Sequence, residues 1–161
     1  MIVLVVLIAA SACAQGQSTA LPPACGPKAS FDVTLDRSQH VLAQPDSGKA
    51  LVYFIGDFGG QSMGPAFLTR FAMDGTWLGA NRNSSYFSVS VAPGERHMCS
   101  ILSSKFLGHL VEFTHFTVEA GKVYYFRARF VGGYFFVDAV DSDEARYLID
   151  RYPQSISKLK K

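Results

Sequence analysis

The sequence predicts a mainly β protein: an antiparallel β-sandwich, immunoglobulin-like or transthyretin-like, with one C-terminal α-helix. Apolar and polar residues alternate in several short runs, which is the period of a half-buried strand. Glycine-containing turns separate these runs at intervals of about ten residues, as in β-sandwiches and barrels. The chain holds 13 Phe and 7 Tyr, and aromatic side chains pack well on pleated sheets. Its 161 residues suffice for one domain with a real core.

A hairpin is expected at the centre of this sandwich. In residues 86–91, apolar side chains alternate with serines, so one face of the strand is apolar. Pro93 and Gly94 follow, and this pair suits a type II turn because proline fixes φ and glycine accepts positive φ. The returning strand, residues 96–103, would direct Cys99 toward the core because an isoleucine two residues on shares its face.

The other strands and turns follow the same two signals. Residues 50–55 are apolar without a break, which predicts a strand buried on both faces. Asp74-Gly75 predicts a tight hairpin because both residues tolerate the positive φ of a type I′ turn. The remaining predicted strands are residues 31–35 at a sheet edge, 68–73, 76–79, 111–119, 122–131 and 134–140.

A helix is expected after the last strand. Four apolar residues before Pro153 are spaced i, i+3, i+4 and i+7, which makes one apolar stripe on a helix. Asp141 or Ser142 can cap its start, and Pro153 ends it. We therefore expect a single sandwich domain over residues 29–153 and a basic tail over residues 154–161.

The N-terminus has the character of a targeting segment. Residues 1–14 combine an apolar core with small residues, which predicts a signal peptide, although only the terminal amine supplies positive charge. Cleavage after Ala14 would release a soluble protein, whereas cleavage before Cys13 would leave that cysteine lipidated. Both routes imply an extracytoplasmic protein, either periplasmic, secreted or anchored as a lipoprotein. Residues 15–28 are polar and then proline-rich, so we expect an extended linker.

The cysteines support an oxidising compartment. Either processing route leaves Cys25 and Cys99, and two cysteines in an exported protein predict a disulfide bond. The alternative is a pair of buried, unlinked thiols. A disulfide would tie the segment around Cys25, which has little regular structure of its own, to a central strand.

Candidate chemistry is sparse. A formal net charge of +2 is too near neutral to indicate nucleic acid binding. His109, Glu112 and His115 have the spacing of metal ligands on a helix, but on a strand the carboxylate faces away from both histidines. The sequence therefore predicts no metal site, no cofactor and no enzyme activity.

Five residues are candidates for a ligand surface. Arg127 and Arg129 share one side of an aromatic strand and could contact an anion or a carbohydrate, although a solvent-facing stripe is the simpler interpretation. Trp77, Tyr86 and Tyr134 would serve a carbohydrate-binding sandwich if they are exposed together.

Three stretches of the chain resemble an uncharacterised bacterial envelope family, domain-of-unknown-function family 2846. They are Asp74-Gly75 with Gly79, residues 86–91 with Pro93-Gly94, and residues 119–122 with Tyr124-Tyr125, and together they span more than half of the chain. The resemblance implies a β-sandwich that is often exported or lipid-anchored. It implies no established activity and no functional residues.

The function expected from all this is an exported bacterial envelope module that binds or scaffolds without catalysis. Its partner would be an envelope protein or a surface polymer, and membrane attachment would come through the signal peptide or a lipid on Cys13. Two alternatives remain: a carbohydrate-binding module, or an enzyme or enzyme inhibitor that acts through the glycine-rich loop of residues 56–66.

Overall fold

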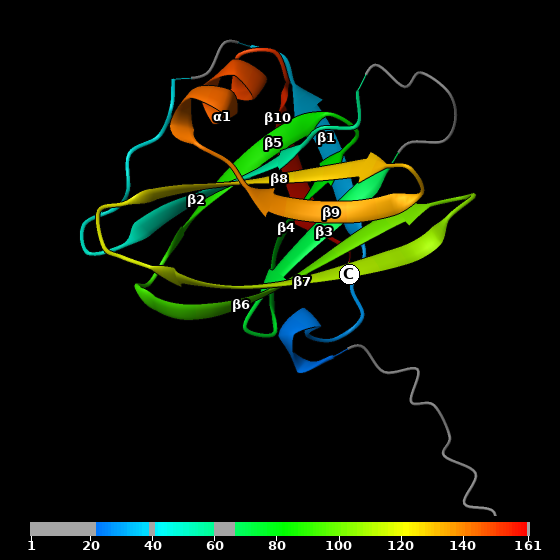
Figure 1. The fold of residues 1–161 in the computed structure, drawn as a ribbon, viewed down its shortest axis with the longest axis horizontal. Coiled ribbons are helices and arrows are strands. Elements are labelled where there is room, and N and C mark those ends of the chain that lie inside the picture. The colour runs from blue at the N-terminus through cyan, green and yellow to red at the C-terminus, as the bar shows by residue number, and fades with distance from the viewer. Residues whose placement is uncertain (1–21, 39–40, 60–66, 161) are drawn as a thin grey trace, which may run out of the picture.

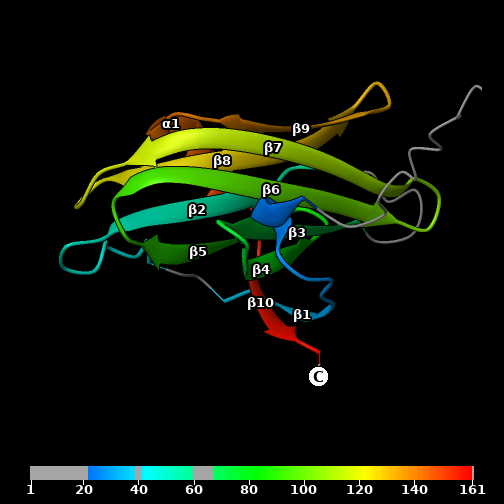
Figure 2. The same ribbon diagram turned by 90° about the horizontal axis from the view of Figure 1, so that it is seen from below.

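The computed structural model describes residues 22–38, 41–59 and 67–160 of the chain. These residues form two β-sheets that pack face to face, with one helix on the outer side of the larger sheet (Figure 1, Figure 2). The predicted β-sandwich with a single C-terminal helix is therefore confirmed. The predicted signal peptide, Cys13 and most of the glycine-rich loop lie outside the described residues.

The two sheets differ in size. The larger sheet has the strand order β1 (Phe31–Asp36), β10 (Gln154–Leu159), β5 (Ser85–Val91), β2 (Ala50–Gly56), β8 (Val123–Val131) and β9 (Tyr134–Ala139). The smaller sheet has the order β4 (Thr76–Arg82), β3 (Leu68–Met73), β6 (Gly94–Ser104) and β7 (Gly108–Val118). The edge position predicted for residues 31–35 is confirmed, since β1 lies at one side of the larger sheet.

β2 is the central strand, and all seven of its residues are buried. Val52 and Phe54 face the smaller sheet, whereas Leu51, Tyr53 and Ile55 face the helix side. The prediction that residues 50–55 form a strand buried on both faces is therefore confirmed. β2 pairs with β5 in antiparallel fashion but with β8 in parallel fashion, so the larger sheet is mixed.

The predicted hairpin around Pro93 and Gly94 is wrong. β5 pairs with β2 and touches β10, whereas β6 pairs with β3 and β7 in the other sheet. The turn therefore carries the chain from one sheet to the other. Alternation of apolar residues shows which face of a strand is buried, but the two strands can bury that face against each other across the core as well as side by side.

Cys99 also faces the other way from the prediction. Met98 and Leu102 of β6 point into the core between the sheets. Cys99 and Ile101 point to the outer face of the smaller sheet, where they are buried with Cys25 and Ala72. The outer face is buried here because the N-terminal segment covers it.

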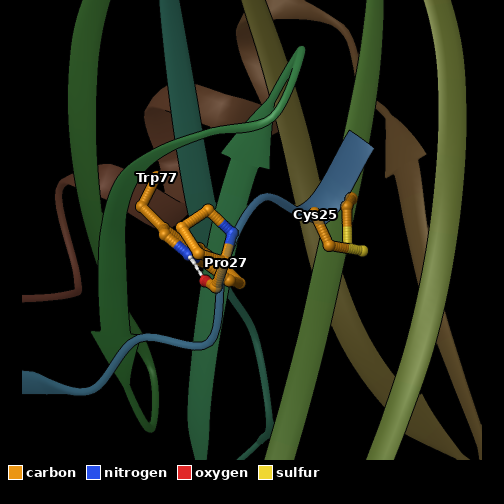
Figure 3. The surroundings of a disulfide bond; sticks show 4 residues. Cys25, Pro27 and Trp77 are labelled. Carbon is orange, nitrogen blue, oxygen red and sulfur yellow. Dashed lines mark hydrogen bonds between the residues drawn. A yellow bond between two sulfur atoms is a disulfide. The ribbon is translucent and has the colours of Figure 1, made fainter. Parts of the chain in front are cut away.

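That segment is attached to the sheet by a disulfide bond. Cys25 ends a short 3-10 helix, η1 (Pro23–Cys25), and is bonded to Cys99, so the predicted pair is confirmed (Figure 3). The indole Nε1 of Trp77 donates a hydrogen bond to the Pro27 carbonyl at 2.6 Å, and the Gly75 amide donates to the Ala24 carbonyl at 3.2 Å. The described part of the expected linker is therefore docked onto the domain.

Two other local predictions are confirmed. Asp74 and Gly75 have φ of 49° and 80° in the turn between β3 and β4, as a type I′ turn requires. The helix, α1 (Ser142–Ile149), is capped by Asp141, whose carboxylate accepts hydrogen bonds from the amides of Asp143 and Glu144 at 2.8 and 2.9 Å. The helix ends at Ile149, before the predicted stop at Pro153. Its apolar stripe packs on the outer side of β2.

The expected basic tail is instead strand β10 over most of its length. All six residues of β10 pair with β1 in antiparallel register. The hydroxyl of Ser155 donates to the Ala80 carbonyl at 2.9 Å, and the hydroxyl of Ser157 accepts from the Ala80 amide at 3.1 Å. These bonds join β10 to β4 of the other sheet. Polar and basic residues alternate with only two apolar ones here, so the strand has a weak sequence signal.

Candidate binding surface

Exposed apolar side chains gather on two hairpins. Among the described residues, eleven large hydrophobic side chains are exposed, and seven of these lie on the β6–β7 and β8–β9 hairpins. We call these seven the hairpin surface: Phe106, Leu107, Val111, Phe113, Val131, Tyr134 and Phe136. Single exposed hydrophobic residues are normally scattered, so these two hairpins are the candidate contact surface.

The turn of the β6–β7 hairpin holds Phe106 away from the domain. The hydroxyl of Ser104 accepts hydrogen bonds from the amides of Phe106 and Leu107 at 3.2 and 3.1 Å. Gly108 then adopts φ of 67°, which a side chain would disfavour. The turn is thus fixed by its own bonds, and it leaves the Phe106 side chain 82% exposed.

The turn of the β8–β9 hairpin presents a second aromatic group. Gly132 and Gly133 have φ of 60° and 90°, which suits a two-residue hairpin turn. Tyr134 follows and is 69% exposed, with its ring centroid 6.3 Å from that of Phe136. The guanidinium of Arg129 lies 5.8 Å from the Phe136 ring and 2.8 Å from Asp138, so its charge is paired.

These two turns lie at the same end of the sandwich, on the right in Figures 1 and 2. The turns at the opposite end carry charged residues instead. At one of these turns, the amine of Lys49 lies 3.5 Å from the carboxylate of Asp46. The Lys49 carbonyl accepts a hydrogen bond at 2.8 Å from the amide of Gly121, in a second turn that carries Glu119 and Lys122. The β6–β7 and β8–β9 turns are therefore more apolar than these turns at the opposite end.

The five predicted ligand-surface residues are not brought together. Trp77 packs edge-on against Phe31, with centroids 6.2 Å apart, beside the N-terminal segment. Tyr86 is only 5% exposed and lies beneath α1. Tyr134 alone of the three aromatic candidates is exposed, and it belongs to the hairpin surface. Trp77, Tyr86 and Tyr134 therefore form no common aromatic platform.

Arg127 connects the helix to the sheet. It is 19% exposed and forms ion pairs with Glu144 of α1 and, at 3.7 Å, with Asp57 at the end of β2. The hydroxyl of Tyr152 donates a hydrogen bond to the other oxygen of Asp57 at 2.5 Å. Arg127 and Arg129 do share the outer side of β8, as expected, but Arg127 is covered by the helix and paired there. Its role is to fix α1 against the sheet.

The environment of the Tyr152 phenol should make the folded protein less stable at alkaline pH. Burial, together with the hydrogen bond to Asp57 and the negative charge of that carboxylate, raises the pKa of Tyr152 to about 12. The folded protein therefore holds this proton more tightly than the unfolded chain, whose tyrosine pKa is 10.0. This contribution to stability is complete below pH 10 and is lost as the pH rises toward 12.

Urea unfolding between pH 9 and 12 would measure this effect. We expect the free energy of unfolding to fall less steeply with pH in Tyr152→Phe than in wild type. A residual fall should remain, because burial also raises the pKa of Tyr53 and Tyr86. Tyr147→Phe, at an exposed position on α1, is the control. Identical slopes for wild type and Tyr152→Phe would contradict the interpretation.

A polar cleft lies beside this network, with a volume of about 500 Å³. Tyr86 and Tyr152 contribute phenol groups, and Arg37, Asp150 and Arg151 contribute charges of both signs. The nearby Asp150 carboxylate adds to burial in raising the pKa of Tyr86. A simple anion would meet repulsion as well as attraction in this cleft, so the charges do not define a ligand class.

Two of the histidines, His97 and His115, form a pair that the sequence does not predict. His115 of β7 stacks on His97 of β6 with ring centroids 4.6 Å apart, because the two residues are cross-strand partners. Within the described ranges, no group of three or more His, Cys, Asp or Glu residues is arranged to hold a metal ion. The described part of the chain also has no helix long and apolar enough to cross a membrane.

The chain matches no known protein-family model, no curated protein and no solved structure. Of the seven residues of the hairpin surface, the sequence predicts only Tyr134. One available signal was Phe106-Leu107 between Lys105 and Gly108, an apolar pair placed where a polar turn is usual.

Proposed function

We propose that this protein is an exported bacterial envelope module that binds another envelope component through its hairpin surface and catalyses no reaction. The observation that carries the proposal is the concentration of exposed apolar side chains on the β6–β7 and β8–β9 hairpins, whose turns lie at the same end of the sandwich. A buried disulfide supports an extracytoplasmic location, because such bonds persist in oxidising compartments.

The hairpin surface suits binding because its backbone is already fixed. The Ser104 hydroxyl bonds both turn amides, and the paired glycines close the other turn. Apolar side chains on fixed turns lose little conformational freedom on contact, so burying them contributes to affinity. Large aromatic groups such as Phe106 and Tyr134 contribute most to interfaces of this kind.

Fractionation of the native envelope tests the proposal. We expect the wild-type protein to remain with envelope material, and the double variant Phe106→Ser/Tyr134→Ser to be released by at least about tenfold more, since each buried aromatic adds on the order of 1.5–3 kcal/mol. Tyr147→Ser is the matched control, because Tyr147 is 59% exposed but lies on α1. Equal retention of the double variant and wild type would refute the role of the hairpins.

A further inference from the structure

We propose that the hairpin surface docks onto a lipid bilayer that carries anionic headgroups. This inference rests on the proposed function and names the binding partner of the same surface. It requires that the apolar end of the sandwich enters the interfacial region of the bilayer, while the charged end points away from it. The attachment is additional to any lipid on Cys13.

The shape of the surface favours a bilayer over a folded protein partner. Tyr134 and Phe136 lie on the outer side of the larger sheet, whereas Val111 and Phe113 lie on the outer side of the smaller one. Phe106 lies in the turn between β6 and β7 and is 82% exposed. That turn is at one end of the sandwich (Figure 2). One rigid partner cannot easily contact two opposite faces and the end between them. A fluid bilayer can surround an inserted end.

The side chains suit different depths of the interface. Phe106 and Leu107, at the turn of their hairpin, are purely apolar and can enter the acyl region. Tyr134 has an apolar ring and a hydroxyl, the combination that is enriched at the level of lipid headgroups. The two turns therefore offer a purely apolar pair on one hairpin and an amphipathic ring on the other.

The charge of the two turns suits anionic lipid. Residues 104–108 and 131–134 include one cation, Lys105, and no acidic residue. Lys105 has no ion pair within the described ranges, so its amine is available to a lipid phosphate. Its long aliphatic stem lets the amine stay at the headgroups while the neighbouring Phe106 inserts. The Arg129 charge nearby is already paired with Asp138.

Co-sedimentation with vesicles tests the inference with the full mature protein. The probes are vesicles of phosphatidylethanolamine with phosphatidylglycerol, and vesicles of phosphatidylcholine alone. We expect binding to the anionic vesicles, and a partition coefficient about tenfold lower for Phe106→Ser, because burial of one aromatic side chain is lost. Lys105→Gln should weaken binding only at low salt, since a surface charge is screened as ionic strength rises. Tyr147→Ser should bind like wild type.

A tryptophan at the turn gives a second readout that does not depend on affinity. In Phe106→Trp, we expect the added indole to shift its emission to shorter wavelength with anionic vesicles. The native Trp77 should not respond, because it is packed beneath the N-terminal segment. Circular dichroism of each variant checks that it is folded.

The outcomes separate the inference from the proposed function. No sedimentation with either vesicle and no spectral shift at position 106 would overturn the membrane inference. If the double variant Phe106→Ser/Tyr134→Ser is nevertheless released from native envelopes, the hairpin surface binds a protein or polymer, and the proposed function stands. Equal sedimentation of wild type and Phe106→Ser would also overturn the inference.

Discussion

The variant Cys25→Ala should lose about 4 kcal/mol of stability under oxidising conditions, because the bond closes a loop with a sequence separation of 74 residues. The cross-link restricts the unfolded chain, and this restriction disappears with the bond. The loss is a large part of the roughly 5–15 kcal/mol by which domains are stable. Thermal or urea unfolding of the oxidised proteins measures it.

The loss should disappear under reducing conditions, where wild type and Cys25→Ala should unfold at nearly the same urea concentration. The double variant Cys25→Ala/Cys99→Ala is the control for a lone thiol. Cys25 and Cys99 are both completely buried, so the double variant removes one more buried sulfur than Cys25→Ala and should be only slightly less stable than it. Free thiols in the oxidised wild-type protein would contradict the structure directly.

The variant Phe54→Ala should destabilise the domain by about 3–5 kcal/mol, the cost typical of removing a buried phenylalanine. Phe54 is fully buried at the centre of β2. Its ring lies 4.7 Å from that of Phe71, 5.1 Å from Phe87 and 6.3 Å from Phe126. These three rings come from β3, β5 and β8, so the cavity would weaken contacts across both sheets.

Urea unfolding compares Phe54→Ala with Tyr147→Ala. Both substitutions remove an aromatic ring, but Tyr147 is exposed on α1, so we expect only a small change there. Phe54→Leu should recover part of the loss, because it refills much of the cavity. If Phe54→Ala and Tyr147→Ala were equally stable, the ring cluster would not be the centre of the core.

The sequence predicted tight turns and the burial of strand faces better than it predicted which strands lie side by side. Asp74-Gly75 specifies its turn locally through positive φ, and residues 50–55 reveal burial on both faces by having no polar residue. The partner of a strand is a long-range property. The alternation of apolar and polar residues in β5 is the same whether β6 lies beside it in one sheet or across the core in the other. The sequence therefore does not show that the turn at Pro93 connects the two sheets.

The sequence also fails to predict strands with little apolar character and the exposure of individual side chains. β10 has little apolar character, and it forms because its backbone completes β1 and because Ser155 and Ser157 bond the Ala80 backbone. Its existence depends on atoms that are distant in the sequence. Likewise, composition cannot reveal that Tyr86 is covered by α1 whereas Tyr134 is open, since both are tyrosines on strands. The disulfide was predictable because only two cysteines remained to be paired.

The most direct test of the central claim, that the hairpin surface is where this protein contacts the envelope, is site-specific photocrosslinking in native envelopes. A photoreactive phenylalanine analogue is placed at position 106, at position 134 or, as the control, at position 147 on α1. We expect cross-linked envelope material, lipid or protein, from positions 106 and 134 and little from position 147. Cross-links from position 147 alone, or equal yields at all three positions, would contradict it.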